Sequence, residues 1–157
     1  MNMLITPEEV IRLSFRESEY LRSTTVLEAD IVAATDRFIT PIIGQTMVEQ
    51  LSLGDYRELM SDYIAPALAA SVRLLIQPLL NIRTEEAGAT SPRTDSTQQA
   101  PQSAMLALHN SLKQRARQLL KRVSDHLNKN ADRYPEYDPK SNILNRCSIN
   151  GGFVQTF

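Results

Sequence analysis

Few side chains in this sequence combine the residue type and the spacing that catalysis or metal binding requires. His109 and His126 fall on one predicted helix, about 25 Å apart along its axis, so within one subunit they cannot share a metal ion or a substrate. Cys147 is the single cysteine, which excludes an internal disulfide and leaves no sequence partner for nucleophilic catalysis. The carboxylate pairs Glu8-Glu9 and Glu85-Glu86 would point about 100° apart on a helix. We expect both histidines to be surface residues.

The motifs of common catalytic and cofactor sites are also missing. The sequence contains no G-x-x-x-x-G-K-[ST], G-x-G-x-x-G, G-x-S-x-G or H-E-x-x-H pattern. Gly151-Gly152 is a turn signal and is too short to hold a phosphate. We therefore predict a protein that is not an enzyme, with no catalytic residues, no cofactor and no metal ion.

Basic residues form the most regular polar pattern in the chain. They follow two edges of a helix predicted from Ala104 to about Ala131: Lys113, Arg117 and Lys121 on one edge, and Arg115, Arg122 and Lys129 on the other. Long basic stems often pack beside a core with the charge in water, but the edges could also bind nucleic acid or an acidic protein. A pI of about 6.1 and the absence of aromatic residues in this helix, on which bases could stack, argue against nucleic acid.

The apolar stripe between these edges is the clearest helical signal in the sequence. Its members recur at spacings of three and four: Met105, Leu108, Leu112, Ala116, Leu119, Val123 and Leu127. A helix of roughly 28 residues would be about 42 Å long, which is comparable to the longest dimension of a small domain.

Two capping patterns predict the first helices. Thr6-Pro7-Glu8-Glu9 favours a short helix to about Phe15, and Thr25-x-x-Glu28 favours a second one. The second helix ends or kinks at Pro41, with Gly44 as its C-terminal cap. One of its faces is apolar: Leu27, Ile31, Ala34, Phe38 and Ile42. One or two helical turns are expected from Gln45 to Leu51.

A third helix is predicted from about Asp55, and it is apolar nearly all round. Such a helix must lie at the centre of a bundle or at a subunit interface. Pro66 predicts a kink near Asp62, and Pro78 predicts a stop or second kink near Leu74.

Two further segments are expected to lie outside the helices. Residues from Thr84 to Ser103 are mainly polar and read as a loop of a length that is usually functional or disordered. Ile143 to Phe157 is too apolar for a solvated tail and could pair as a short hairpin or an edge strand. We expect this arm to dock on its own bundle or on a neighbour through Phe153, Val154 and Phe157.

Composition favours one all-α domain. The chain has 157 residues, 42% of them hydrophobic, with 5 glycines, no tryptophan and 6% aromatic residues, which argues against a strand-rich fold. The expected layout is a bundle of about four main helices: an N-terminal helical part (1–83), a polar loop (84–103), a long helix (104–131) and a C-terminal arm (132–157). Met1 to Leu13 lacks the pattern of a signal peptide, and Arg73 and Gln77 interrupt the one long apolar stretch, so we expect a soluble intracellular protein.

The net charge of −1 hides two oppositely charged halves. Residues 1–65 hold 11 acidic and 5 basic side chains, whereas the remaining 92 hold 7 acidic and 12 basic ones. Such halves can meet within one molecule, or they can pair head to tail between copies of the chain.

The order of these features resembles the phage head–tail connector family. The resemblance covers about Met3 to Ile82 and rests on the opening Ile5-Thr6-Pro7-Glu8-Glu9-Val10, on Ile31-x-x-Ala34-x-x-x-Phe38-Ile39 ending at Gly44, and on the Ala-rich helix from Tyr63 to Leu80. It implies a small all-helical adaptor without catalytic residues, which forms a ring, possibly of twelve copies, below the portal. Such a ring extends the DNA channel toward the tail.

The resemblance also implies partners and a location. The chain would be a structural protein of the virion neck, found in the host cytoplasm during assembly, and would contact the portal, further neck or tail proteins and DNA that passes without sequence recognition. In such a ring the acidic half of one subunit would face the basic half of the next, and the loop and the arm from Asn142 to Phe157 would become ordered on assembly. The alternative is a helical protein whose function is nucleic-acid binding.

Overall fold

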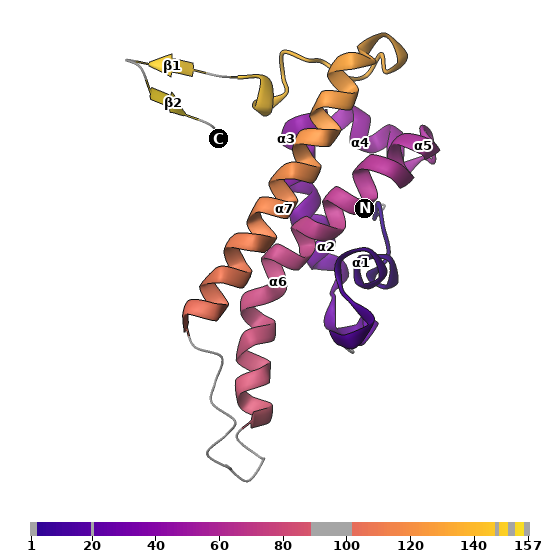
Figure 1. Cartoon of the computed structure of the whole chain (residues 1–157). Helices are drawn as coiled ribbons and strands as arrows, with labels where there is room; N and C mark the ends of the chain where they lie inside the picture. Colours follow the sequence, from indigo (N-terminus) through magenta and orange to yellow (C-terminus); the bar gives the residue numbers. More distant parts are fainter. Residues whose placement is uncertain (1–2, 20, 89–101, 147, 151–152, 156–157) are drawn as a thin grey trace.

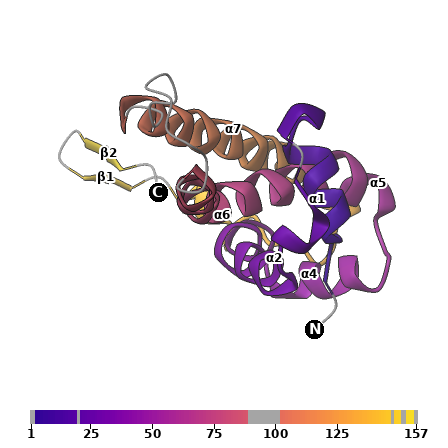
Figure 2. The ribbon, with the colours of Figure 1, turned by 90° about the horizontal axis from the view of Figure 1, so that it is seen from below.

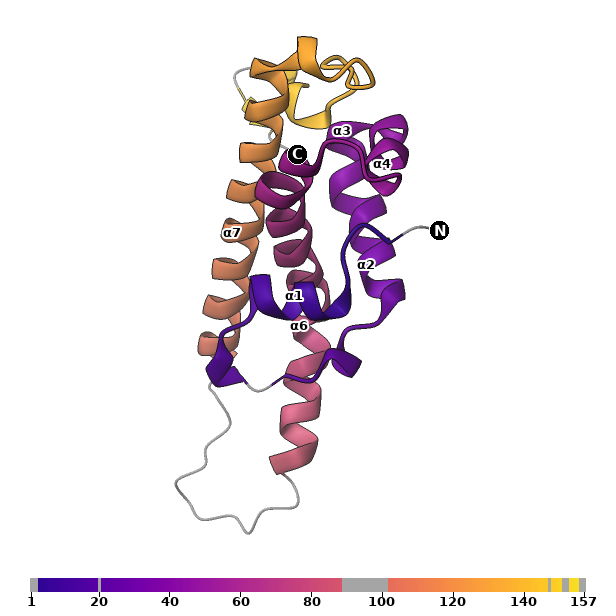
Figure 3. The same cartoon turned by 90° about the vertical axis from the view of Figure 1, so that its right-hand side faces the viewer.

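One long helix lies at the centre of the fold. The computed structural model describes residues 3–19, 21–88, 102–146, 148–150 and 153–155. The central helix α6 (Ala65–Gly88) packs against α1 (Pro7–Ser14), α2 (Glu28–Ala34) and α7 (Gln102–Lys129). Figure 2 shows α6 with α7 on one side and α2 on the other, while Figure 3 shows α1 crossing α6. The predicted all-α class is confirmed, but the short crossing helix α1 means that the layout is not four aligned helices.

Helix α1 begins as its sequence predicts. Thr6 and Glu9 form the reciprocal capping box: the Glu9 N–H donates to Thr6 Oγ1 at 3.3 Å, and the Thr6 N–H donates to Glu9 Oε2 at 2.8 Å. The helix ends at Ser14, whose hydroxyl donates to the Val10 carbonyl at 2.6 Å. Two short 3₁₀ turns follow, η1 (Glu17–Glu19) and η2 (Ser23–Thr25).

The predicted start of the second helix was wrong. Thr25 lies in η2, and α2 begins at Glu28 with Leu27 as the residue before it. The Asp30 carboxylate accepts the Leu27 N–H at 3.0 Å, which satisfies one free donor of the first turn. Next to this start Val26 is buried, whereas Leu27, predicted on the apolar face, is exposed.

Helix α2 passes through a widened turn before its proline. It continues through the π turn η3 (Thr35–Ile39) into α3 (Thr40–Ile43), and the Thr40 N–H donates to the Thr35 carbonyl, five residues back. Proline has no N–H and its ring crowds the carbonyl four residues before it, so the wider turn accommodates Pro41 without ending the helix. Gly44 then ends α3 at φ 85°, as predicted.

A second π turn precedes Pro66. Here α5 (Arg57–Leu59) continues through η4 (Met60–Ile64) into α6, and the Ala65 N–H donates to the Met60 carbonyl. The predicted distortion near Asp62 is therefore present as η4. Of the stop or second kink predicted from Pro78, the stop was wrong, since α6 runs on to Gly88 with Pro78 inside it.

The connection between α3 and α5 contains one further helix. Helix α4 runs over Gln45–Ser52, so it extends one residue beyond the helical turns expected from Gln45 to Leu51. Tyr56 then adopts a left-handed conformation, φ 56° and ψ 49°, and α5 starts after it rather than at Asp55. A left-handed tyrosine is strained, and its hydroxyl donates to Glu136 at 2.8 Å, which helps to hold it in place.

The two long helices form an antiparallel pair. Helix α6 continues to Gly88 and α7 begins at Gln102, so both ends of the loop predicted at 84–103 are helical, and residues 89–101 lie outside the described residues. Figure 1 shows the C-terminal end of α6 reaching past the first turn of α7. The segment Arg57–Ile82 is long and apolar enough to cross a membrane by length and composition, but half of its most apolar window is buried in the fold, as in a core helix.

The chain ends in the hairpin that the sequence suggested. After the 3₁₀ turns η5 (Ala131–Arg133) and η6 (Ile143–Asn145), strands β1 (Ser148–Asn150) and β2 (Phe153–Gln155) pair in antiparallel register, with Ile149 opposite Val154. Figures 1 and 2 show this hairpin standing apart from the helices.

Candidate functional site

The predicted stripe of α7 is buried along only part of its length. Leu112, Ala116, Val123 and Leu127 are buried as expected, whereas Leu108 is exposed. Met105 and Leu119 are half-buried, and the neighbouring Leu120 is buried instead. The core face of α7 is thus rotated slightly from the predicted stripe, and burial fades toward the start of the helix.

The exposed end of the α6–α7 pair carries four large apolar side chains. On α6 they are Leu79 and Ile82, exposed by 59% and 52%; on α7 they are Leu106 and Leu108, exposed by 59% and 38%. We call this region the open end. Isolated exposed leucines are common on proteins, but a group of four at one end of a helix pair is typical of a contact surface.

The six predicted basic residues of α7 are all exposed, but the two edges differ in their contacts. On the edge of Arg115, Arg122 and Lys129, the Arg122 guanidinium lies 4.7 Å from the centre of the Tyr63 ring. On the other edge, Lys121 pairs with Asp125 of its own helix at 3.1 Å, an exposed pair of small energetic value. Lys113 and Arg117 have no acidic partner in the described part of the chain.

The opposite end of α7 contains a cluster that the sequence analysis missed. His126 stacks on Tyr63, with ring centres 4.0 Å apart, and its Nε2 lies 3.1 Å from the Tyr134 hydroxyl. Tyr134 in turn meets Tyr56 edge to face at 5.1 Å. His126 is therefore a half-buried packing residue, and its predicted surface position was wrong; His109 is exposed as predicted.

Electrostatics in this cluster follow from burial and from the neighbouring charges. Burial lowers the pKa of His126, and the nearby Arg133 and Arg122 lower it further. The hydrogen bond to Glu136 raises the pKa of the Tyr56 hydroxyl, and burial raises that of Tyr134. Neutral side chains thus fill the cluster, which fits a structural role.

A buried asparagine holds the start of the predicted arm. Asn142 is fully buried, and its amide donates to Ser124 Oγ at 2.8 Å and to the Tyr137 hydroxyl at 2.7 Å. Its Oδ1 accepts the Leu144 N–H at 2.9 Å. Together with the aromatic cluster around His126, this network defines the closed end of the bundle. The arm from Asn142 was expected to order on assembly, but its first residues, up to the half-buried Leu144, belong to the fold.

The predicted docking residues of the arm are described only in part. Phe153 and Val154 lie in β2, where only the backbone pairing is described, and Phe157 lies outside the described residues.

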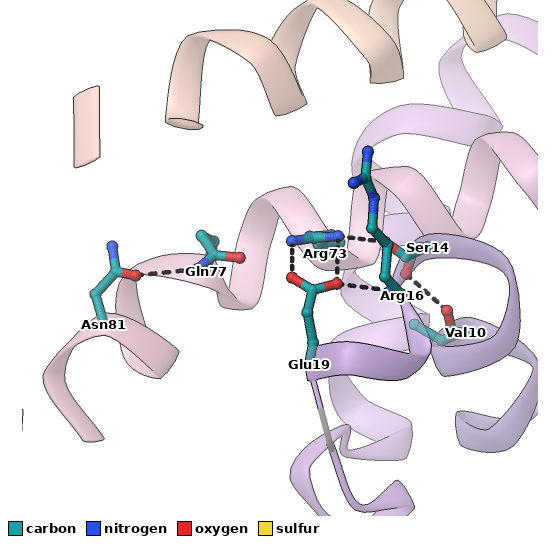
Figure 4. A network of polar contacts seen from close by, with 7 residues as sticks. All are labelled: Val10, Ser14, Arg16, Glu19, Arg73, Gln77 and Asn81. Carbon is teal, nitrogen blue, oxygen red and sulfur yellow. Dashed lines mark hydrogen bonds and ion pairs between the residues drawn. The ribbon is translucent and has the colours of Figure 1, made fainter. Parts of the chain in front are cut away.

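An arginine joins the two oppositely charged halves of the chain. The Arg73 guanidinium on α6 donates to both carboxylate oxygens of Glu19, at 2.6 and 3.2 Å, and to the Ser14 carbonyl (Figure 4). It also lies 4.4 Å from the centre of the Phe15 ring. This contact attaches the segment after α1 to the central helix and gives one intramolecular example of the predicted charge pairing.

The polar line on α6 continues beyond Arg73. Gln77 and Asn81 occupy the next two turns, and the Gln77 amide donates to Asn81 Oδ1 at 3.0 Å (Figure 4). Among the described side chains, Arg73 Nε and Gln77 Oε1 are buried without a hydrogen-bond partner. A donor and an acceptor on adjacent turns are the groups that a buried water molecule can satisfy.

The described side chains offer no centre for metal chemistry. Within residues 3–19, 21–82 and 102–146, no three histidine, cysteine or acidic side chains gather in a position to hold a metal ion. The features that stand out are the open end, the exposed basic edges of α7 and the closed end opposite.

Comparison with known proteins places the chain in a family. Residues 21–146 match a family of unknown function, DUF6712, and the chain belongs to this family. The match spans α2 to η6, and so includes both long helices and the network around Asn142. Neither the curated proteins nor the solved structures contain a match to the chain.

Proposed function

We propose that this chain is a structural subunit of the phage neck, a head–tail connector that forms a ring below the portal, extends the DNA channel and joins the capsid to the tail. The observation that carries the proposal is the open end, where Leu79, Ile82, Leu106 and Leu108 are each exposed. For a single chain it is unfavourable to leave such side chains in water, whereas a subunit of an assembly buries them at its contacts. The resemblance of residues 3–82 to connector proteins supplies the identity of the assembly.

The basic edges of α7 suit a ring with a channel. Arg122 is held over Tyr63, but Lys113 and Arg117 are free of acidic partners within the described residues. Repeated around a ring, either edge could line a channel with positive potential, which would favour DNA of any sequence. Each edge has one cation engaged inside the subunit, Lys121 with Asp125 and Arg122 over Tyr63, so the contacts within the subunit do not choose between the two edges.

The first experiment is a mass measurement. Light scattering and native mass spectrometry of the full chain, across concentration and salt and with the portal present, should give one closed oligomer near twelve copies. A chain that remains a monomer under all these conditions, portal included, would contradict the proposal.

A truncation tests the arm separately. Because Asn142 and Leu144 are part of the fold, the deletion must begin at Cys147, not at Asn142 as the sequence alone suggested. Removing residues 147–157 should leave the unfolding transition unchanged and weaken assembly or binding to the portal. Full assembly of the truncated chain would mean that Phe153, Val154 and Phe157 are not docking residues.

Nucleic-acid binding is the alternative function, and the six exposed cations of α7 favour it. A dedicated DNA-binding protein should bind duplex as a monomer, with an affinity that falls steeply with salt. Substitution of Lys113 and Arg117 by alanine should then reduce the slope of that salt dependence by about one per lost phosphate contact. Weak binding that appears only in the oligomer would favour the channel instead.

A further inference from the structure

The acidic half of the molecule contains a groove that no segment of the described chain fills. It has a volume of about 340 Å³ and lies between the N-terminal segment, α2 with its π turn, and α4. Leu4, Val32 and Val48 give it an apolar lining, and Leu53, exposed by 74%, stands at its edge. Its shape and lining fit a few aliphatic side chains.

Two carboxylates mark this groove. Asp36 and Glu49 both line it and both are exposed. Glu49 accepts one hydrogen bond, from the Gln45 amide at 3.3 Å, and Asp36 has no ion-pair partner among the described residues. An apolar cavity with unpaired carboxylates at its margin favours a partner that presents leucine-like side chains next to cations.

The open end of the same chain has that combination. Leu106 lies on the face of α7 that continues, two and three turns later, with Lys113 and Arg117. Lys113 is about 10 Å from Leu106 along the helix axis, which is a suitable distance for an aliphatic contact inside a groove and an ion pair at its margin. The C-terminal segment 147–157 is also apolar but has no basic side chain, so the carboxylates do not select it.

We propose that the groove of one copy receives the open end of the next copy, with Leu106 in the groove and Lys113 and Arg117 beside Asp36 and Glu49. This inference rests on the proposed ring and specifies its subunit contact. Figure 3 shows the groove-forming helices α2 and α4 away from the free end of α6. Because the two surfaces are different, the contact is head to tail and does not give a two-fold dimer; its repetition closes into a ring when the rotation between copies divides a full turn.

A cysteine pair tests the position of the contact. In a Cys147→Ser background, Leu53→Cys and Leu106→Cys are combined in one chain, both at exposed sites. Mild oxidation should link successive subunits into a ladder on a non-reducing gel. The control pair, Leu27→Cys with Leu106→Cys, uses another exposed leucine, which does not line the groove, and should form no ladder.

A charge exchange tests the chemistry of the contact. Asp36→Lys with Glu49→Lys, or Lys113→Glu with Arg117→Glu, should raise the concentration needed for assembly at least about tenfold, because each places like charges together. All four substitutions in one chain should restore assembly. Glu28→Lys with Glu58→Lys and Arg22→Glu with Lys140→Glu are controls at exposed sites outside the groove and the basic edges, and they should assemble like the unmodified chain.

The outcomes separate this contact from the ring itself. A closed oligomer that is insensitive to the groove and edge substitutions, and that gives no ladder, would overturn the contact and leave the ring standing. A ladder from Leu53→Cys with Phe157→Cys instead of Leu106→Cys would assign the groove to the C-terminal segment and overturn the proposal. Absence of any oligomer, with or without the portal, would overturn both the ring and the contact.

Discussion

The two ends of helix α7 differ in how far their side chains are buried, hydrogen-bonded or ion-paired. At the closed end, Leu127 is buried, His126 is stacked and hydrogen-bonded, and the buried Asn142 uses both its amide donor and its carbonyl. At the open end, Leu106 and Leu108 remain in water and Lys113 has no described acidic partner. One helix thus packs into the core at one end and leaves apolar side chains exposed at the other.

We infer from this difference that the closed end contributes to stability and the open end to a contact outside the subunit. Polar groups at the closed end are paired, as expected where the surrounding structure specifies one conformation. At the open end, apolar area stays exposed although the same helix has a core-forming face, so its sequence there is better explained by a contact outside the subunit. The following changes test this division, from the largest expected effect to the smallest.

Truncating one leucine at each end of α7 should give the largest contrast. Leu127→Ala removes a fully buried side chain and should lower the free energy of unfolding by about 2–5 kcal/mol. Leu106→Ala should change it by less than about 0.5 kcal/mol, because the side chain is already exposed. Urea denaturation at concentrations below assembly measures both. Equal losses would show that the open end is part of the core.

Asn142→Ala should be the next most damaging change. It removes three hydrogen bonds and should cost about 2–3 kcal/mol, because the Leu144 N–H loses its acceptor while Ser124 and Tyr137 keep only their bonds to Asn128. The matched control is Asn145→Ala, whose side chain also forms hydrogen bonds but is exposed. A smaller loss from Asn142→Ala than from Asn145→Ala in urea would contradict the assignment of Asn142 to the closed end.

Arg73→Leu tests the contact between the charge halves, which lies between the two ends. Loss of the bonds to Glu19 and to the Ser14 carbonyl should lower stability by about 1–2 kcal/mol, since Glu19 is partly exposed and can be hydrated. Arg12→Leu is the control, because its pair with Glu9 is long, at 3.9 Å, and exposed. Proteolysis of the segment after Phe15 should be faster in the Arg73 variant and unchanged in the Arg12 variant. An unchanged rate in the Arg73 variant would contradict the attachment of this segment by Arg73.

The smallest of these effects is expected from His126, in the dependence of stability on pH. The pKa of His126 is lowered in the fold, so below its unfolded value of about 6.5 the unfolded chain binds more protons than the folded one, and stability falls as the pH drops. Melting temperatures between pH 8 and pH 5.5 measure this loss. His126→Gln should reduce it, and His109→Gln, at an exposed site, should not.

Local features of the fold were readable from the sequence because they depend on neighbours in the chain. The capping box of Thr6 and Glu9, the cap at Gly44 and the long amphipathic helix all follow from residues a few positions apart. The distortion near Asp62 belongs to the same class, since it is a steric property of Pro66.

Other local predictions failed. Thr25-x-x-Glu28 has the right residues for a helix start, but Thr25 lies in a 3₁₀ turn and α2 starts at Glu28. Pro78 has the right residue type for a stop, but α6 continues to Gly88 with Pro78 inside it. The exposure of Leu108 within the periodic stripe could not be predicted either. Periodicity identifies the apolar face of a helix but does not show how far the elements packed against that face extend.

By itself, the sequence determined the all-α class, the long apolar central helix and the opposite charge of the two halves, because composition and periodicity act within each segment. The tertiary structure alone decided which histidine is half-buried, which asparagine holds the C-terminal segment and which α7 cation lies over an aromatic ring. Those properties depend on contacts such as Tyr63 with His126, Ser124 with Asn142, and Arg122 with Tyr63, whose partners come from different segments. No local pattern encodes such pairings, because they exist only once η4 lies against α7 and the segment after α7 folds back onto that helix.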